Sequence, residues 1–123
     1  MNFSFDQNSP IYQQLADQLE EMIFLGIYQP GDQVPSTTQL SQQLHINPAT
    51  ILKGMNLLVA KGLLEKKRGL GMFVTDQADK AIGTQRHDDF YQDYVLATVT
   101  EAKKLNLDQD TLISLIKRGY EHE

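Results

Sequence analysis

The sequence predicts a mainly α-helical fold with one small β-hairpin, and three observations carry that prediction. Apolar residues recur at three- and four-residue steps over most of the chain, as on the buried faces of helices. Two short runs on either side of residue 70 flank a glycine-containing loop, as in a hairpin. Apolar residues make up 41% of the 123 residues and charged residues 22%, an ordinary globular mixture. We therefore expect one small head with a real core, followed by a short helical tail.

The first predicted helix runs from about Ser9 to Leu25, with Gly26 well placed to end it. The segment after it contains Pro30-Gly31-Asp32, a turn signal in which glycine can supply a positive backbone φ. The helix is amphipathic because its apolar residues recur with helical spacing at Leu15, Leu19, Met22 and Ile23.

Two further helices follow with only a short turn between them. The segment Ser36-Thr37-Thr38-Gln39 fits a capping box and predicts a helix that runs to about Leu44. After His45-Ile46, Asn47 can cap a third helix, from about Pro48 to Lys61. This spacing is that of a helix-turn-helix, whose second helix enters the major groove of DNA by its N-terminal residues. The residues that we expect in the core of this head are Leu40, Leu44, Ile51, Met55, Leu58 and Leu64.

The hairpin follows the third helix directly. Residues 63–67 and 72–75 flank Arg68-Gly69-Leu70-Gly71, which predicts two short strands and a glycine-containing loop. Such a hairpin after a helix-turn-helix is a wing. The elements together predict a winged helix-turn-helix DNA-binding domain over residues 1–76.

Residues 77–123 are predicted to form a linker and a short helical dimerisation region. The segment from Asp76 to about Gln85 shows no clear periodicity, and two helices then follow, the second capped by Asp108. Neither helix is long enough to bury its apolar stripe alone, so we expect a second copy to cover it. The alternative is a small-molecule effector pocket lined by the aromatic residues, although no particular effector is indicated. The residues assigned to dimerisation are Phe90, Tyr91, Tyr94, Val95, Val99, Leu112, Leu115, Ile116 and Tyr120.

Charge is unevenly distributed along the chain. The formal net charge is −5, which argues against indiscriminate binding of nucleic acid. Between residues 53 and 68, however, basic residues outnumber the single acid, Glu65. A local basic surface therefore lies on an acidic body, and it comprises Lys53, Lys61, Lys66, Lys67 and Arg68.

The predicted contacts with double-stranded DNA come from three places. The start of the second helix offers amides and hydroxyls to a phosphate, the start of the third helix faces the bases, and the hairpin loop reaches the backbone. Successive strand residues point to opposite faces, so Lys66 and Lys67 should not both contact DNA. The candidate residues are Ser36, Thr37, Thr38, Asn47, Pro48, Ala49, Thr50, Lys53, Lys67, Arg68, Gly69 and Gly71.

Five short blocks resemble the GntR family of bacterial transcription regulators in order and spacing, and the short tail resembles the YtrA subfamily in particular. That resemblance implies a homodimer, paired through its tail on a palindromic operator and often encoded near transporter genes. The sequence departs from the family pattern at Thr38 and Leu70, where the family usually carries a basic residue. The matching blocks are Pro10-Ile11-Tyr12-Gln13-Gln14, Pro30-Gly31-Asp32, Val34-Pro35-Ser36, Asn47-Pro48-Ala49-Thr50 and Gly69-Leu70-Gly71-Met72-Phe73-Val74.

Other classes of function fit the sequence less well. No nucleophile–base pair, phosphate loop or metal-ligand spacing indicates an enzyme, and we expect no cofactor or metal. Cysteine is absent and no export signal or membrane span is indicated, so we expect a cytoplasmic protein. The remaining expectations are a sequence-specific regulator, acting as a repressor, or alternatively a winged-helix module that binds proteins instead of DNA.

Overall fold

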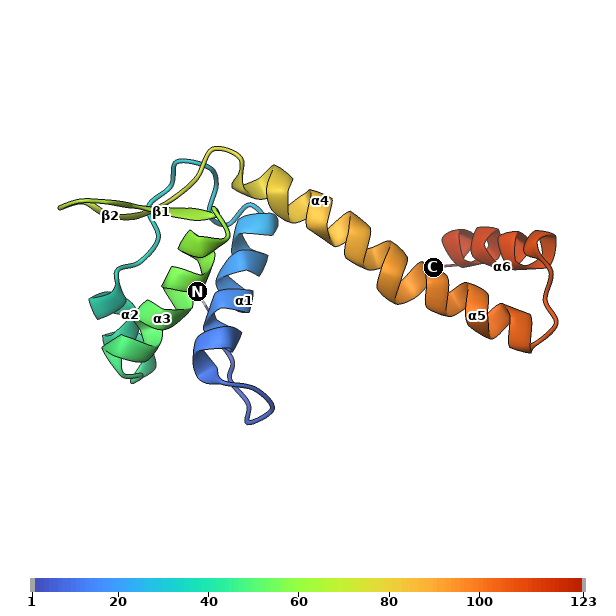
Figure 1. Ribbon diagram of the computed structural model, residues 1–123, viewed down its shortest axis with the longest axis horizontal. Coiled ribbons are helices and arrows are strands. Elements are labelled where there is room, and N and C mark those ends of the chain that lie inside the picture. Colours follow the sequence, from blue (N-terminus) through green and yellow to red (C-terminus); the bar gives the residue numbers. More distant parts are fainter. Residues whose placement is uncertain (1, 123) are drawn as a thin grey trace. The chain divides into compact units, whose positions relative to one another are not determined.

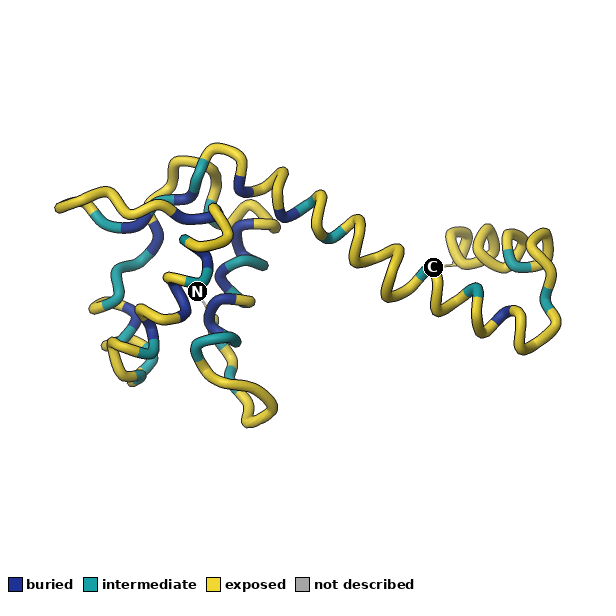
Figure 2. Tube along the Cα trace, in the orientation of Figure 1, coloured by how far each residue is buried: buried dark blue, intermediate teal, exposed yellow. Residues whose placement is uncertain are grey.

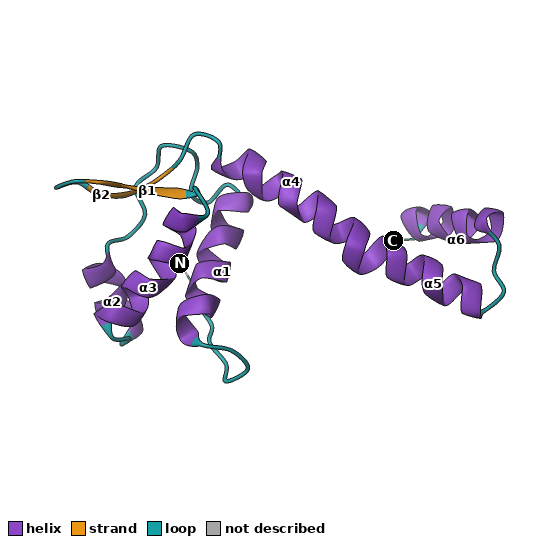
Figure 3. Ribbon diagram, in the orientation of Figure 1, coloured by secondary structure: helices purple, strands orange, loops and turns teal. Residues whose placement is uncertain are grey.

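The computed structural model describes residues 2–122 and separates the chain into two compact units. The first unit, Met1–Thr84, is called the head, and the second, Gln85–Glu123, is called the tail. Helices and one antiparallel hairpin make up the fold, as the sequence predicts (Figures 1 and 3). Each unit is described by itself.

The helices of the head confirm the predicted order. They are α1 (Ile11–Phe24), α2 (Thr37–Leu44) and α3 (Pro48–Ala60). After α3, Gly62 adopts a φ of 77°, and the amide of Leu63 donates to the carbonyl of Leu58 at 2.9 Å. This is a glycine C-cap, in which a residue without a Cβ closes the helix and satisfies its last carbonyls.

Side-chain caps begin both helices of the helix-turn-helix. The Ser36 hydroxyl accepts from the amide of Gln39 at 3.0 Å, and the Gln39 side chain accepts from the amide of Ser36 at 2.8 Å. Asn47 Oδ1 accepts from the amide of Ala49 at 2.8 Å. Between the helices His45 takes the left-handed conformation, with φ 56°, which turns the chain within a single residue. Local chemistry therefore fixes where α2 ends and where α3 begins.

The core of the head lies where α1 packs on α3. Leu15, Leu19 and Ile23 of α1 are buried with residues of α3 and of the hairpin. Gly54 lies at the centre of this helix contact. A Cβ at this position would lie 2.7 Å from the backbone carbonyl oxygen of Tyr12, so a larger residue would push the two helices apart. Of the predicted core residues, Leu44 is only partly buried, and those that are fully buried are Leu40, Ile51, Met55, Leu58 and Leu64.

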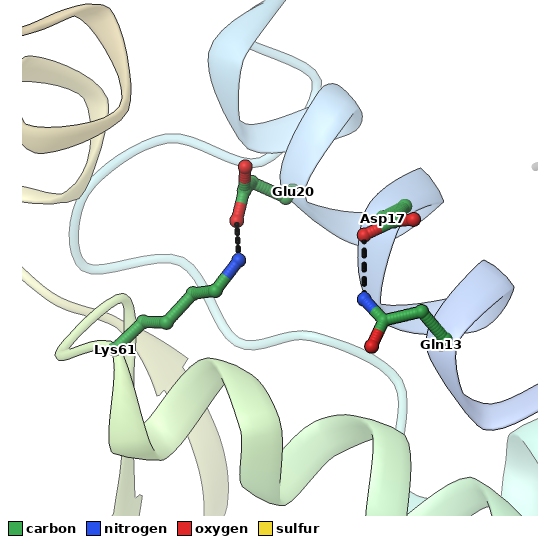
Figure 4. A network of polar contacts seen from close by, with 4 residues as sticks. All are labelled: Gln13, Asp17, Glu20 and Lys61. Atoms are coloured by element: carbon green, nitrogen blue, oxygen red, sulfur yellow. Dashed lines mark hydrogen bonds and ion pairs between the residues drawn. The ribbon is translucent and has the colours of Figure 1, made fainter. Parts of the chain in front are cut away.

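A polar contact joins the same two helices at their other end (Figure 4). Lys61, the C-cap of α3, places its ammonium 3.0 Å from a carboxylate oxygen of Glu20 on α1. Along α1, Gln13 donates to Asp17 at 2.9 Å. Half-exposed ion pairs of this kind contribute roughly 0–1 kcal/mol to stability. The position of α3 on α1 therefore depends mainly on apolar packing.

The wing is a hairpin of β1 (Leu64–Lys67) and β2 (Gly71–Val74), paired antiparallel with Leu64 opposite Val74 and Lys67 opposite Gly71. The segment 31–34 extends this sheet on the other side of β2. The amides of Gly31 and Val34 donate to the carbonyls of Val74 and Met72, at 2.8 and 3.0 Å. Residues between α1 and α2 thus hold the wing from outside its own hairpin.

An arm over residues 3–9 runs back along α1. Gln18 accepts from the amide of Ser4 at 3.0 Å and donates to the carbonyl of the same residue at 2.7 Å. Gln14 accepts from the amide of Asp6 and donates to the carbonyls of Asp6 and Ser9. The rings of Phe3 and Phe5 stack at 6.1 Å and pack against the core.

The predicted linker over residues 76–85 is wrong, because helix α4 (Ala78–Phe90) occupies most of it. Ala78 and Ile82 are buried and join the core of the head. They stand four residues apart, one helical turn, but the residues around them are polar. Two apolar positions leave little periodicity to detect, although burial on the head is enough to stabilise the helix.

The tail contains helices with almost no core of their own. A π-helical turn, η1 (Tyr91–Val95), precedes α5 (Leu96–Lys104), and α6 (Gln109–Glu121) follows. Asp108 caps α6 by accepting from the amide of Thr111 at 2.8 Å, and this hydrogen bond holds the pKa of its carboxyl below the usual value. Figure 2 shows no buried residue in α6, and Ala102 is the buried residue of α5.

No helix within residues 2–122 combines the length and the apolar character that crossing a membrane requires.

The close approach at Gly54 gives a prediction about stability. Replacing Gly54 with alanine should destabilise the protein by about 1–3 kcal/mol, because the new methyl group meets backbone that cannot rotate away. Gly83→Ala is the matched control: nothing lies within 4 Å of a Cβ there, so it should be neutral or stabilise α4 by up to about 1 kcal/mol. Chemical unfolding of both variants measures the difference. Equal stability of the two would mean that α1 and α3 pack less tightly than the structure shows.

Candidate nucleic-acid interface

The buried residues of α3 determine which face of the helix points outward. Ile51, Met55 and Leu58 are buried, and Gly54 lies against α1. Because a helix turns once in 3.6 residues, the opposite face is exposed, and its residues follow the spacing i, i+3, i+4, i+7. They are Ala49, Leu52, Lys53 and Asn56.

The predicted contacts at the start of α3 are mostly accessible. Asn47, Pro48 and Ala49 are exposed, whereas Thr50 is half-buried and lies at the side of the helix. The Asn47 side chain uses its oxygen for the cap, which leaves its amide nitrogen to donate to another group. The tip of α3 therefore offers small side chains and one donor.

The start of α2 divides the three predicted hydroxyl residues by role. Ser36 is the cap, and the Thr37 hydroxyl donates to the sulfur of Met55 at 3.7 Å. Thr38 is exposed. With its first-turn amides at the helix N-terminus, this end of α2 is suited to a phosphate, and Thr38 is the hydroxyl best placed to reach one.

Lys53 is held by a residue that sequence reasoning did not assign to the site. Its ammonium lies 4.1 Å from the centroid of the Tyr12 ring on α1. The contact follows from the close approach at Gly54, which brings the first turn of α1 beside this part of α3. A cation–π contact at an exposed site contributes about 0.5–1 kcal/mol, enough to favour one position of the side chain and not to bind it permanently.

The wing carries cations on both of its faces. Lys67 lies with its ammonium 4.7 Å from the Phe73 ring and 3.7 Å from a carboxylate oxygen of Glu65. Lys66 stands opposite Met72, on the other face, as the strand alternation predicts. Within residues 2–122, Arg68 has no ion pair, and it is exposed at the turn. Arg68 is therefore more available to a phosphate than Lys67, whose ammonium lies near Glu65 and Phe73.

The turn of the wing is braced by Gln33, a second residue that sequence reasoning missed. Its side-chain nitrogen donates to the carbonyl of Leu70 at 2.7 Å. Gly69 and Gly71 both have positive φ, and a Cβ on Gly71 would lie 2.7 Å from that same nitrogen. Gly69 and Gly71 thus shape the turn. The Leu70 side chain between them is exposed, at the position where the family pattern usually has a basic residue.

Signals for the missed residues were weak in the sequence. Gln33 and Tyr12 act across 37 and 41 residues, and nothing in a single sequence pairs such positions. Leu52 and Asn56 could be found by extending the spacing of Ala49 by one and two turns. Leucine, however, is more often buried than exposed, so sequence reasoning assigns Leu52 to the core and not to a binding face.

Comparison with protein families identifies the chain. The model described as "Bacterial regulatory proteins, gntR family" matches residues 11–74, which span α1 to the end of β2. The chain belongs to the GntR family. This confirms the resemblance seen in the sequence, and with the winged fold it makes the chain a DNA-binding transcriptional regulator.

Two curated relatives from Bacillus subtilis show how far the likeness extends. YhcF, described as an HTH-type transcriptional regulator, is 29% identical over 117 residues, 95% of both chains. The HTH-type transcriptional repressor YtrA is 35% identical over 71 residues, 58% of this chain and 55% of YtrA. The chain therefore spans nearly all of YhcF but about half the length of YtrA.

Solved structures of GntR-type proteins share the fold. A GntR family regulator from Listeria monocytogenes is 28% identical, with a TM-score of 0.68 over 93% of this chain and 98% of that one. The AraR DNA-binding domain, solved in complex with operator ORX1, is 29% identical with a TM-score of 0.56. That match covers 61% of this chain and 96% of the AraR domain.

The brace at the wing predicts a coupling in this GntR-family chain. Gln33→Ala should weaken DNA binding by about two- to tenfold, the value of one hydrogen bond, because Arg68 is then presented from a looser turn. In an Arg68→Ala background the same change should have no further effect. Titration of labelled duplex with the four proteins of this cycle measures the coupling, and Gln109→Ala in the tail is the control. Equal losses in both backgrounds would show that Gln33 does not act through Arg68.

Proposed function

We propose that this DNA-binding regulator is a repressor that holds a palindromic operator as a homodimer. In the proposal, α3 enters the major groove by its first turns and the wing contacts the flanking backbone. The tail joins two heads, so that their half-sites lie about one helical turn, ~34 Å, apart. Bound in this way, the dimer blocks access of the transcription machinery to the promoter.

The observation that carries the proposal is the outward face of α3 beside exposed cations that the fold does not neutralise. The tip of α3 is exposed, Lys53 is positioned on that face, and Arg68 stands at the wing turn. In Figure 1, α2 and the wing turn lie at the same left-hand side of the head. The AraR domain, which shares this fold, was solved on an operator, and this likeness disfavours a module that binds only proteins.

The homodimer is supported by what the tail leaves exposed. Below about 40 residues a unit rarely buries enough apolar surface to be stable alone, and the tail is of that size. Its aromatic residues are open to solvent, with Tyr94 64% and Tyr120 89% exposed. A second copy would cover them, and the proposed dimer surface keeps the residues assigned from the sequence: Phe90, Tyr91, Tyr94, Val95, Val99, Leu112, Leu115, Ile116 and Tyr120.

Repression is supported by the relatives, since YtrA is described as a transcriptional repressor. The place of action would be the cytoplasm, where the operator is found. The tail offers little to a small-molecule effector, because the shallow hollow lined by Ile116, Gly119 and Tyr120 is open and mainly apolar, with few polar groups to orient a ligand.

The cations give a test of the DNA-binding surface. Lys53→Ala and Arg68→Ala should each weaken binding, and each should reduce the slope of log affinity against log salt by about one, because one phosphate contact is lost. Lys80→Ala, an exposed lysine on α4, is the matched control and should leave both quantities unchanged. Fluorescence anisotropy over a series of salt concentrations provides the measurement. Variants that keep the wild-type slope would place the DNA elsewhere on the head.

The tail gives a separate test of assembly. Ile116→Glu should convert the dimer to a monomer, because a carboxylate would be buried in an apolar interface. Affinity for a complete palindrome should then fall, while affinity for a single half-site should not, since only the linkage of two heads is lost. Sedimentation velocity measures the assembly state. Leu25→Glu, at an exposed apolar residue of the head, is the control that should remain dimeric; an Ile116→Glu dimer would contradict the assignment of the interface.

A further inference from the structure

An apolar side chain stands on the face of α3 that is turned away from the core. Leu52 is 41% exposed, although the other large aliphatic residues of this helix are buried or half-buried. Its neighbours one turn away are Ala49 and Asn56, at i−3 and i+4. Leu52 therefore has no aliphatic partner of its size on this face within the head.

The position of Leu52 is one from which a recognition helix reaches base edges. In helices that lie in the major groove, the base-reading residues share a face with the spacing i, i+3, i+4, i+7. Ala49, Leu52, Lys53 and Asn56 have that spacing and are all exposed. The contact with the Tyr12 ring directs the Lys53 side chain toward α1. The Lys53 side chain in this position leaves Leu52 uncovered.

We propose that Leu52 reads a thymine in each half-site through the C5-methyl group. The inference rests on the proposed function and deepens it, since it names the chemical feature of the operator that this chain prefers. The methyl group of thymine is the one apolar group that any base pair presents in the major groove. A leucine side chain, which has no donor or acceptor, can make a favourable contact there with that group alone.

The same chemistry disfavours a G·C pair at this position. Guanine presents two acceptors and cytosine an amino donor in the major groove. Opposite Leu52 these polar groups would lose water and gain no hydrogen bond, which carries a free-energy cost. Discrimination by Leu52 therefore comes both from contact with thymine and from the penalty on a G·C pair.

A protein partner fits this surface less well than DNA does. Docking patches for proteins are contiguous apolar areas of several hundred Å². Leu52 instead stands among a small residue, an amide and a cation, on the helix of the family's DNA-binding fold. The surface is continuous with the DNA-binding face, and this continuity favours a base as the occupant.

The experiment begins with the full chain and a random pool of duplexes. Wild-type protein should select a palindrome with an invariant thymine at one position of each half-site. Leu52→Ala should select the same palindrome with that single position degenerate. The matched control is Leu25→Ala, the same substitution at another exposed leucine of the head, just after α1, and it should keep the wild-type preference at every position.

A second measurement isolates the methyl group. Replacing the selected thymine by deoxyuridine keeps every hydrogen-bonding group and removes only the methyl, so wild-type affinity should fall about fourfold per half-site, the value of one buried methylene-sized group. For Leu52→Ala the affinities for the two duplexes should be equal. Unchanged thermal unfolding of Leu52→Ala would show that the head is intact.

The outcomes separate this inference from the function on which it rests. If wild-type protein selects a palindrome but Leu52→Ala selects it with the same preferences, or loses as much as wild type on deoxyuridine, Leu52 does not read the thymine and the inference fails alone. If wild-type protein enriches no sequence at all, the proposed operator binding fails as well. Loss of preference at the predicted position, with deoxyuridine sensitivity lost in the variant only, supports the inference.

Discussion

The contact of α1 with α3 through Gly54 is the constraint on which the rest of the head depends. Because glycine lets the two backbones approach, Leu15 and Leu19 reach the buried side of α3 and orient that helix. Once one face of α3 is committed to the core, the opposite face must be presented to solvent. The same approach sets Tyr12 beside Lys53, so that one glycine orders both the buried packing and the exposed cation.

The wing depends on a different constraint, exerted by the chain between α1 and α2. Segment 31–34 adds to the sheet beside β2, and Gln33 reaches the turn. A two-stranded hairpin alone is at best marginally stable in water. Here its geometry is shared with the loop that also leads into α2, so the helix-turn-helix and the wing have a common support.

Local chemistry made the head predictable from sequence. Caps at Ser36 and Asn47, the stop at Gly62 and the alternation of β1 each act within a few residues, and the structure has them as expected. What could not be predicted acts at long range: Gln33 on Leu70, Tyr12 on Lys53, and the burial of Ala78 and Ile82 that turns an expected linker into α4. In the tail, helices and the Asp108 cap were foreseen, but the π-helical turn at Tyr91–Val95 has no local signal that we recognise.

The arm over residues 3–9 constrains how this sequence can drift over evolutionary time. Gln14 and Gln18 hold the arm by the backbone amides and carbonyls of Ser4 and Asp6. The Asp6 carboxylate also accepts from the amide of Asn8 at 2.9 Å, whereas the Ser4 side chain takes no part in these bonds. Hydrogen bonds to the backbone do not depend on which side chain the arm carries, but they do depend on the spacing of its residues. Proline cannot supply the amide that these bonds need. Substitutions should therefore accumulate more freely at Ser4 than at Asp6, whereas insertions, deletions and prolines at either position should be eliminated by selection.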